Sequence, residues 1–89
     1  MLLVDKEEDG EMTKREIYNQ AFIDTFEVSA DMLENLAYME IQQWDSVGHM
    51  SLIAAIEDAF DIMMDTDDII DFSSYKKGIE ILKKYDVEI

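Results

Sequence analysis

Apolar residues recur with helical periodicity from residue 14 to residue 27, which predicts the first helix of an all-α protein. The residues on this face are Ile17, Tyr18, Ala21, Phe22 and Phe26. Thr13 and Glu16 have the spacing of a capping box, in which the threonine hydroxyl accepts from an early amide and the glutamate reaches back. We therefore expect a helix from Lys14 to Glu27. No proline interrupts this helix or any later one.

The next segment, from Ser29 to Trp44, has no sustained apolar period. We predict a long loop, with only an incipient turn around residues 31–35. A structureless connection of this length is unusual in a compact domain and normally has a functional reason or local structure of its own. It would allow the helices on either side to run parallel. The apolar residues that we expect to anchor this loop to the core are Met32, Leu33, Leu36, Met39, Ile41 and Trp44.

Residues 46–60 have the clearest helical pattern in the chain, and Asp45 before them is a strong N-cap residue. The predicted buried face consists of Leu52, Ile53, Ile56 and Phe60. A second apolar strip on the other side consists of Val47, Met50 and Ala54, with the acidic Glu57 and Asp58 beyond it. A helix with two apolar faces is either deeply buried or docks a partner. In so small a domain we favour docking, and the alternative is that Val47 and Met50 complete the core.

Two further helices are predicted before the C-terminus. A short third helix is indicated by Ile69, Ile70 and Phe72. Ser73 or Ser74 would be the N-cap of the fourth helix. Tyr75, Ile79 and Leu82 share one stripe of the fourth helix, and Gly78 between them marks a close helix approach. Lys83 and Lys84 favour the C-terminus of this helix because they complement its dipole.

The composition limits the chain to one domain. Its 89 residues are 48% apolar and sufficient for a single core, and the absence of cysteine excludes disulfides and thiol chemistry. Residues 5–11 are almost all charged, and we predict that residues 1–12 form a disordered extension of a folded domain at residues 13–86. No segment is typical of a targeting signal or a membrane span, so we expect a cytoplasmic protein.

The acidity of the chain is distributed unevenly. Twenty-two acidic residues oppose seven basic ones, the formal net charge is −15, and no Lys or Arg occurs from Glu16 to Tyr75. Such a surface repels nucleic acid and anionic lipid, and it favours basic protein partners. The alternative is that the acidic residues only keep a small protein soluble.

The sequence Asp45-Ser46-Val47, at the start of a helix after a long loop, resembles the Asp-Ser-Leu type motif of the acyl carrier proteins. The later sequence Glu57-Asp-Ala-Phe-Asp-Ile is also similar to that family. The resemblance covers residues 13–85, including the helix order and the small residue at Gly78. It implies a four-helix bundle of acyl-carrier type, with a long loop between helices one and two and a short third helix.

The same resemblance implies roles for individual residues. Ser46 matches the serine that receives 4'-phosphopantetheine from coenzyme A, and Asp45 matches the aspartate that helps to hold the metal ion and cofactor during attachment. The chain would be a monomeric carrier rather than an enzyme, modified by a phosphopantetheinyl transferase that needs Mg²⁺. Its other partners would be acyl or aminoacyl loading enzymes and synthases with basic docking patches. The matching recognition residues are Val47, Met50, Ala54, Glu57 and Asp58.

The chain departs from the family pattern around this serine. Many members have a glycine before the Asp-Ser pair and an acidic residue soon after it. This chain instead has Gln43-Trp44 before the pair and Gly48, His49 and Ser51 after it. It also lacks the proline that many fatty-acid carriers have after the position of Asp61. The departures around the serine leave the choice of partner open, and the missing proline points to a specialised carrier for polyketide, peptide, amino-acid or surface-polysaccharide modification. The cargo stays open between fatty acyl, polyketide and aminoacyl groups, because the arm is the same for all of them.

Ser46, His49 and the aspartates that follow also resemble parts of other functional sites. A serine hydrolase does not fit, because Trp44 stands where the first glycine of a nucleophile elbow belongs, and we expect His49 to be solvent-exposed or a docking residue.

The aspartates do not form an EF-hand loop, but loose binding of Mg²⁺ or Ca²⁺ to them would raise the melting temperature. Among the methionines, we expect Met50 to be the exposed one. The remaining alternative to a carrier is an unmodified acidic helical adaptor or basic-protein-binding mimic. The aspartates in question are Asp61, Asp65, Asp67, Asp68 and Asp71.

Overall fold

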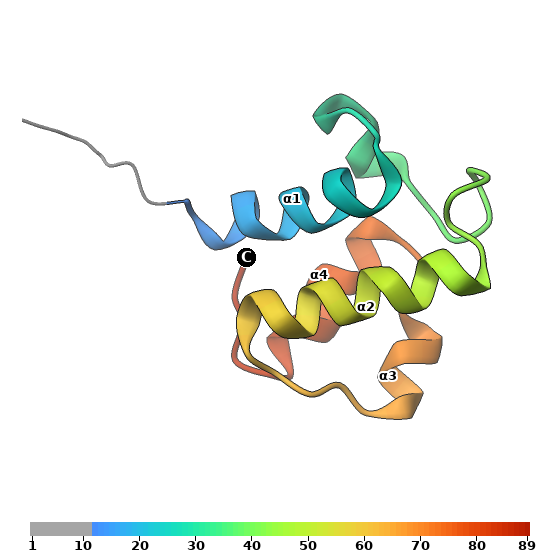
Figure 1. Cartoon of the computed structure of the whole chain (residues 1–89). Helices are drawn as coiled ribbons and strands as arrows, with labels where there is room; N and C mark the ends of the chain where they lie inside the picture. The colour runs from blue at the N-terminus through green and yellow to red at the C-terminus, as the bar shows by residue number, and fades with distance from the viewer. Residues whose placement is uncertain (1–11) are drawn as a thin grey trace, which may run out of the picture.

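The computed structural model describes residues 12–89, which contain five helices and no strand (Figure 1). The prediction of an all-α fold is confirmed for these residues. The predicted disordered extension lies, except for Met12, outside them. In chain order the elements are α1 (Lys14–Phe26), the 3₁₀ helix η2 (Ala30–Asn35), α2 (Ser46–Phe60), α3 (Thr66–Asp71) and α4 (Tyr75–Lys83).

Local capping signals set the ends of α1. The amide of Glu16 donates to the Thr13 hydroxyl over 3.1 Å, and the amide of Thr13 donates to the Glu16 carboxylate over 2.8 Å. Both hydrogen bonds of the predicted capping box are therefore present. The helix ends one residue earlier than predicted, because Glu27 adopts a left-handed conformation with φ 57° and donates its amide to the Ile23 carbonyl.

The predicted starts of the two other long helices are also confirmed. Asp45 is the N-cap of α2, which covers the whole predicted range to Phe60. Ser74, rather than Ser73, caps α4, because its hydroxyl accepts a hydrogen bond from the Lys77 amide over 3.0 Å. Each of these ends is fixed by a side chain that lies within three residues of the amide it binds.

The α1 and α2 helices run antiparallel (Figure 1), so the expectation that they would run parallel was wrong. The Gln43 side-chain amide, just before α2, donates to the Phe26 carbonyl at the end of α1 over 3.1 Å. At the other end, Met12 and Ile17 line the same shallow groove as Ala59. A long loop permits either direction, and these end-to-end contacts select the antiparallel one.

The segment that we predicted as a loop contains the helix η2, which lies where the incipient turn was indicated. Met32 and Met39 are exposed, so they are not the anchors that we expected. Met39 lies in a turn, has a left-handed φ of 69°, and is 65% exposed. The anchors that are fully or almost fully buried are Leu33, Leu36 and Trp44.

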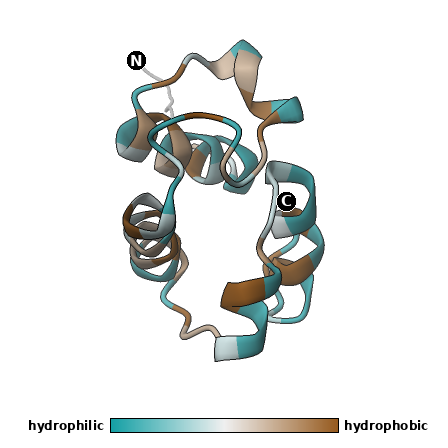
Figure 2. Cartoon of the chain, turned by 90° about the vertical axis from the view of Figure 1, so that its right-hand side faces the viewer, coloured by the Kyte–Doolittle hydropathy of each residue, from teal (hydrophilic) through white to brown (hydrophobic). Residues whose placement is uncertain are grey.

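Hydrophobic and hydrophilic residues alternate along the helix ribbons in Figure 2, as expected for helices that bury one face. Leu52, Ile53 and Ile56 are the buried residues of α2, and Phe60 packs against the core while half-buried. Among residues 12–89, no helix has both the length and the apolar character needed to cross a bilayer.

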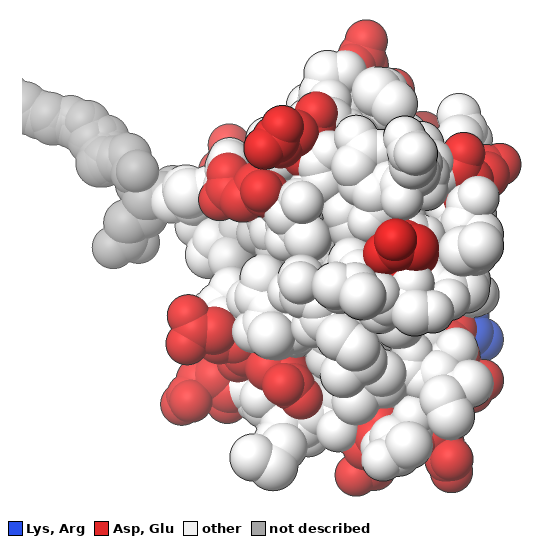
Figure 3. Space-filling model, turned by 45° about the vertical axis from the view of Figure 1, so that its right-hand side comes forward, with Lys and Arg blue, Asp and Glu red and all other residues white. Residues whose placement is uncertain are grey.

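The acidity of the sequence is visible on the surface. Acidic side chains surround broad uncharged areas on the face shown in Figure 3, whereas basic side chains are scarcely visible there. This distribution follows from the sequence, because every Lys and Arg lies before Glu16 or after Tyr75.

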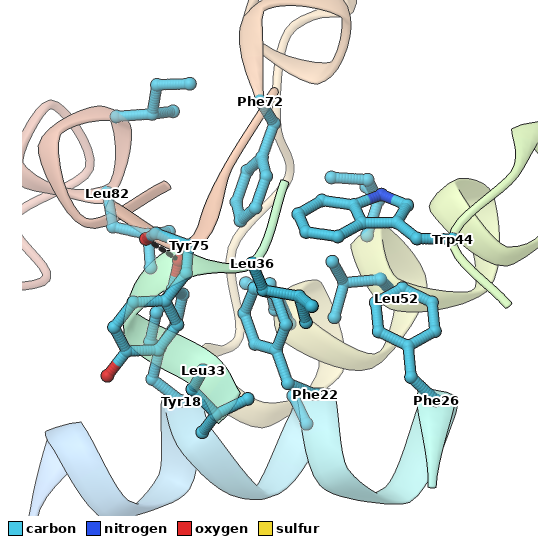
Figure 4. Packing of buried hydrophobic residues seen from close by; sticks show 14 of the residues in the cluster. Tyr18, Phe22, Phe26, Leu33, Leu36, Trp44, Leu52, Phe72, Tyr75 and Leu82 are labelled. Carbon is cyan, nitrogen blue, oxygen red and sulfur yellow. Dashed lines mark hydrogen bonds between the residues drawn. The ribbon is translucent and has the colours of Figure 1, made fainter. Parts of the chain in front are cut away.

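An aromatic cluster forms the centre of the core (Figure 4). The ring of Phe22 meets those of Tyr18, Trp44 and Tyr75 edge-to-face, with centroid distances of 5.1, 5.5 and 5.4 Å. Such pairs contribute about 0.5–1.5 kcal/mol each beyond the burial of their area. The Tyr18 hydroxyl donates to the Tyr75 carbonyl over 2.7 Å, and burial raises the pKa of this phenol far above its ordinary value. The core continues to the C-terminus, where Val87 is also buried.

Gly78 on α4 packs directly against two rings of this cluster. A Cβ atom at this position would lie 2.2 Å from both Phe72 Cζ and Tyr18 Oη. The prediction that Gly78 allows close packing is therefore confirmed.

Candidate functional site

Ser46 is exposed and is the first residue of the 15-residue helix α2. Asp45, which is also exposed, is the N-cap of this helix, and its side chain and its carbonyl each accept one hydrogen bond from the first turn. Its Oδ1 accepts from the Gly48 amide over 2.9 Å, and its carbonyl accepts from the His49 amide over 2.7 Å. The Ser46 hydroxyl thus lies where the helix dipole and the outward-pointing amides favour a negative charge.

The first turn of α2 packs directly against the preceding loop. A Cβ at Gly48 would lie 1.9 Å from the Gln43 carbonyl oxygen and 3.2 Å from the ring of Phe26. Only glycine therefore fits here without displacing the backbone. The loop that contains Gln43 thus closes onto the first turn of α2 through its backbone.

Tyr38 contributes a polar side chain that contacts Ser46. Its Oη lies 3.2 Å from Ser46 Oγ, in a hydrogen bond in which either oxygen can donate. The amide of Tyr38 donates to the Ser73 carbonyl over 2.9 Å, and Ala37 forms an isolated β-bridge with Ser74. The loop that carries Tyr38 is thus fastened to the chain just before α4, and the phenol is directed toward α2.

A pocket of about 340 Å³ opens beside Ser46, between α2 and α3. Apolar and aromatic side chains contribute most of its lining, and hydroxyl groups lie among them. An apolar chain of moderate size would lose its contact with water inside such a pocket. The lining residues are Tyr38, Ser46, His49, Met50, Ile69, Ile70, Phe72 and Ser73.

His49 fastens α3 to α2 and forms part of the pocket wall. The Trp44 indole N–H donates to His49 Nδ1 over 2.9 Å, and His49 Nε2 lies 2.7 Å from the Ile69 carbonyl oxygen. Since an indole nitrogen only donates, Nδ1 is the acceptor, so Nε2 carries the hydrogen of the neutral ring and donates to Ile69. We expected an exposed or docking histidine; the expectation of full exposure was wrong, and a docking role stays a prediction. The residue is half-buried because both ring nitrogens have partners inside the protein.

A second polar contact fastens α3 to the end of α4. Asp68 is buried, and its carboxylate accepts hydrogen bonds from Lys84 Nζ over 2.6 Å and from the Tyr85 hydroxyl over 2.5 Å. The hydrogen bond from Lys84 is the main cause of a lowered pKa at Asp68, and the hydrogen bond from Tyr85 lowers this pKa further. The same contact with Asp68 raises the pKa of Lys84. The outer wall of the pocket is thus held from two sides, by His49 and by this cluster.

Four of the five predicted recognition residues are exposed on α2, and one has a partner within the chain. Val47 is 76% exposed and Met50 is 53% exposed, and Ala54 and Asp58 are exposed as well. Glu57 is half-buried, and its carboxylate accepts from the Met64 amide over 2.8 Å. The strip of Val47 and Met50 therefore does not complete the core. Glu57 has a structural contact to the loop after α2 that its place in the sequence did not indicate.

Exposed apolar side chains extend beyond this strip. Ile70 on α3 is 71% exposed, and Met63 in the loop before α3 is 85% exposed. Met50 is exposed as predicted, but it is not the exception among the described methionines, of which Met64 is the buried one. Ile70 and Met50 line the same pocket. The exposed apolar surface thus continues from α2 across the pocket to α3.

The aspartates between α2 and α4 do not form a metal site. Among residues 12–89, no group of three or more His, Cys, Asp or Glu side chains is arranged to hold an ion. Asp68, one of the five aspartates, is occupied by Lys84 and Tyr85. Loose binding of divalent ions to the others stays a prediction.

The residues that sequence reasoning missed are those whose partners lie far along the chain. Tyr38 lies in a segment without periodicity, and nothing in its neighbourhood indicates that it meets a residue eight positions later. His49 binds a carbonyl 20 residues away. A polar residue at a predicted apolar position of a helix is the signal that could have drawn attention to His49.

Comparisons with known proteins add no relative. A scan against protein-family models, a search of curated proteins and a search of solved structures each found no match.

Proposed function

We propose that this chain is an acyl carrier protein with a four-helix bundle of that type, and that Ser46 carries 4'-phosphopantetheine. The observation that carries the proposal is the exposed Ser46 hydroxyl at the first residue of α2, beside an apolar pocket. The resemblance of residues 45–47 to the modification motif agrees with this placement. The chain itself catalyses no step in this proposal and is the substrate of a transferase.

In the attachment step, Ser46 Oγ bonds to the phosphorus next to pantetheine in coenzyme A. The bond from that phosphorus to the oxygen that bridges to the second phosphate breaks, and adenosine 3',5'-bisphosphate leaves. The Ser46 proton passes to a base of the transferase, which also binds Mg²⁺. Asp45 uses Oδ1 to cap α2, so Oδ2 is the oxygen with which it would assist that ion. A phosphate at the first turn of α2 would gain about 0.3–1 kcal/mol from the helix dipole.

The surroundings of Ser46 fit a carrier of apolar cargo. A group on an arm attached at this position would reach the pocket between α2 and α3, whose apolar lining would shield it from water. Val47, Met50 and Ala54 would meet apolar residues of a partner, while Asp58 would face a basic patch. Charge-steered docking of this kind favours rapid association and rapid exchange between partners.

The test is the intact mass of the protein after incubation with coenzyme A, Mg²⁺ and a broad-specificity phosphopantetheinyl transferase. We expect the wild type to gain the mass of one phosphopantetheine and Ser46→Ala to gain none. Ser51→Ala is the matched control, since Ser51 is an exposed serine on the same helix, and it should be modified like the wild type. An unmodified wild type would contradict the carrier proposal and favour the acidic adaptor, which acts by docking alone.

A further inference from the structure

We infer that the hydroxyl of Tyr38 is a binding group for the phosphate on Ser46, donating a hydrogen bond that directs the pantetheine arm toward the pocket. This inference rests on the proposed function of Ser46. It adds a residue that lies outside the Asp-Ser motif, in the loop between α1 and α2.

The geometry before modification already joins the two groups. Tyr38 Oη lies 3.2 Å from Ser46 Oγ. In the unmodified protein either oxygen can donate, but a phosphodiester removes the Ser46 hydrogen and leaves only acceptors on that side. Any hydrogen bond that survives modification must therefore be donated by Tyr38. The non-bridging phosphate oxygens lie two bonds beyond Oγ, through the phosphorus, so a small movement of the arm brings one of them to the phenol.

The position of Tyr38 is fixed by the surrounding fold. Its amide donates to Ser73, and its ring meets His49 edge-to-face with 5.3 Å between the centroids. The Trp44 ring also lies edge-on to it, at 6.5 Å. A donor held in this way loses little conformational freedom when it binds.

The charges around Ser46 make such a donor valuable. The phosphodiester adds a negative charge next to the carboxylate of Asp45, and no Lys or Arg occurs from residue 16 to residue 75. Two of the amides at the start of α2, those of Gly48 and His49, already donate to Asp45. An uncharged phenol supplies a charge-assisted hydrogen bond at this place. Because the phenol has no positive charge, it does not reduce the negative charge of the docking surface on α2.

The direction of the arm follows from the location of the phenol. Tyr38 and Ser46 both line the pocket, together with Met50 and Ile70 on its apolar side. A phosphate oxygen bound to Tyr38 would turn the ester toward this opening. The arm would then leave Ser46 on the pocket side rather than along the solvent-facing side of α2.

The test compares phosphopantetheinylated wild type, Tyr38→Phe and Tyr75→Phe by phosphorus NMR and by melting temperature. Tyr75→Phe is the matched control, because it removes a phenol hydroxyl that binds Asn19 on α1. We expect the phosphorus resonance to shift in Tyr38→Phe and not in Tyr75→Phe. The gain in melting temperature on modification should be smaller in Tyr38→Phe alone.

A second measurement on the wild type avoids dependence on any variant. In protein labelled with ¹³C at the Cζ of its four tyrosines, modification should shift the resonance of Tyr38 most. If the wild type is modified but neither its Tyr38 resonance nor the phosphorus resonance of Tyr38→Phe responds, the role of Tyr38 is refuted while the carrier function stands. A wild type that accepts no phosphopantetheine overturns both.

Discussion

Replacing Gly78 by alanine should destabilise the protein even though alanine is the better helix former. In an exposed helix this substitution would stabilise by about 1 kcal/mol. At Gly78 the new Cβ would lie 2.2 Å from Phe72 Cζ and from Tyr18 Oη, and both rings are fully buried. Neither ring has free space to move into, since each packs against other aromatic rings.

The size of the effect follows from three contributions. Overpacking a well-packed core costs about 1–3 kcal/mol, and the short distances here favour the upper end of that range. Moving Tyr18 would also weaken its buried hydrogen bond to the Tyr75 carbonyl, which is worth about 1 kcal/mol. After subtraction of the gain in helix propensity, the free energy of unfolding should fall by about 2–3 kcal/mol. For a domain of this size, each kcal/mol lowers the melting temperature by about 4–8 °C.

The assay is urea unfolding followed by circular dichroism, with Lys77→Ala as the control. Lys77 is exposed on the same helix, and its substitution should change the unfolding free energy by less than about 0.5 kcal/mol. The double variant Gly78→Ala with Phe72→Leu should lose less stability than the sum of the single variants, because the smaller side chain makes room. A neutral or stabilising Gly78→Ala would show that the rings yield easily, and would refute this account of the core.

Three further predictions concern the wall of the pocket and the acidic surface. His49→Phe should lower the free energy of unfolding by about 2–4 kcal/mol, because it leaves the buried Trp44 N–H and the Ile69 carbonyl without partners. Hydrogen exchange of the α3 amides should accelerate in this variant, and unchanged exchange would contradict the role of His49. Because the pKa of Asp68 is lowered in the folded protein, its contribution to stability is present above the pKa of an unfolded aspartate and is lost as the pH falls through the folded value. Calorimetry should therefore show that the stability difference between wild type and Asp68→Asn shrinks on acidification. A difference that stays constant from neutral to acidic pH would show that the contact with Lys84 does not matter for folding. Millimolar Mg²⁺ or Ca²⁺ should raise the melting temperature more than NaCl of equal ionic strength does, because clustered carboxylates repel one another, and equal effects of the salts would exclude ion binding.

The sequence predicts those parts of this fold that depend on neighbouring residues. Thr13, Asp45 and Ser74 each bind an amide three residues away, so their caps can be recognised from spacing alone. The direction of α2 relative to α1 could not be predicted in this way. It depends on contacts between distant residues, such as that of Gln43 with Phe26, which become visible only when the chain is folded.

In the candidate site, too, features that depend on neighbouring residues could be predicted and features that depend on distant residues could not. The position of Ser46 at the start of a helix, and the exposure of Val47 and Met50, follow from a local cap and a helical period. The pocket does not, because five of its eight lining residues come from outside α2: one from the loop before that helix, two from α3 and two from the segment just after α3. The hydrogen bond of Tyr38 to Ser46 likewise requires a loop conformation that no periodicity encodes.

The single tryptophan of the chain is placed where it can report on the site optically. Trp44 is fully buried, stacks on Phe26 at a centroid distance of 5.3 Å, and donates its indole N–H to His49 Nδ1 over 2.9 Å. Its fluorescence emission should therefore be blue-shifted in the folded state and respond both to unfolding and to movement of the loop that bears Tyr38. Because Ser46 lies only two residues away, we expect attachment of a group there to change this emission, which would allow the reaction to be followed without an added dye.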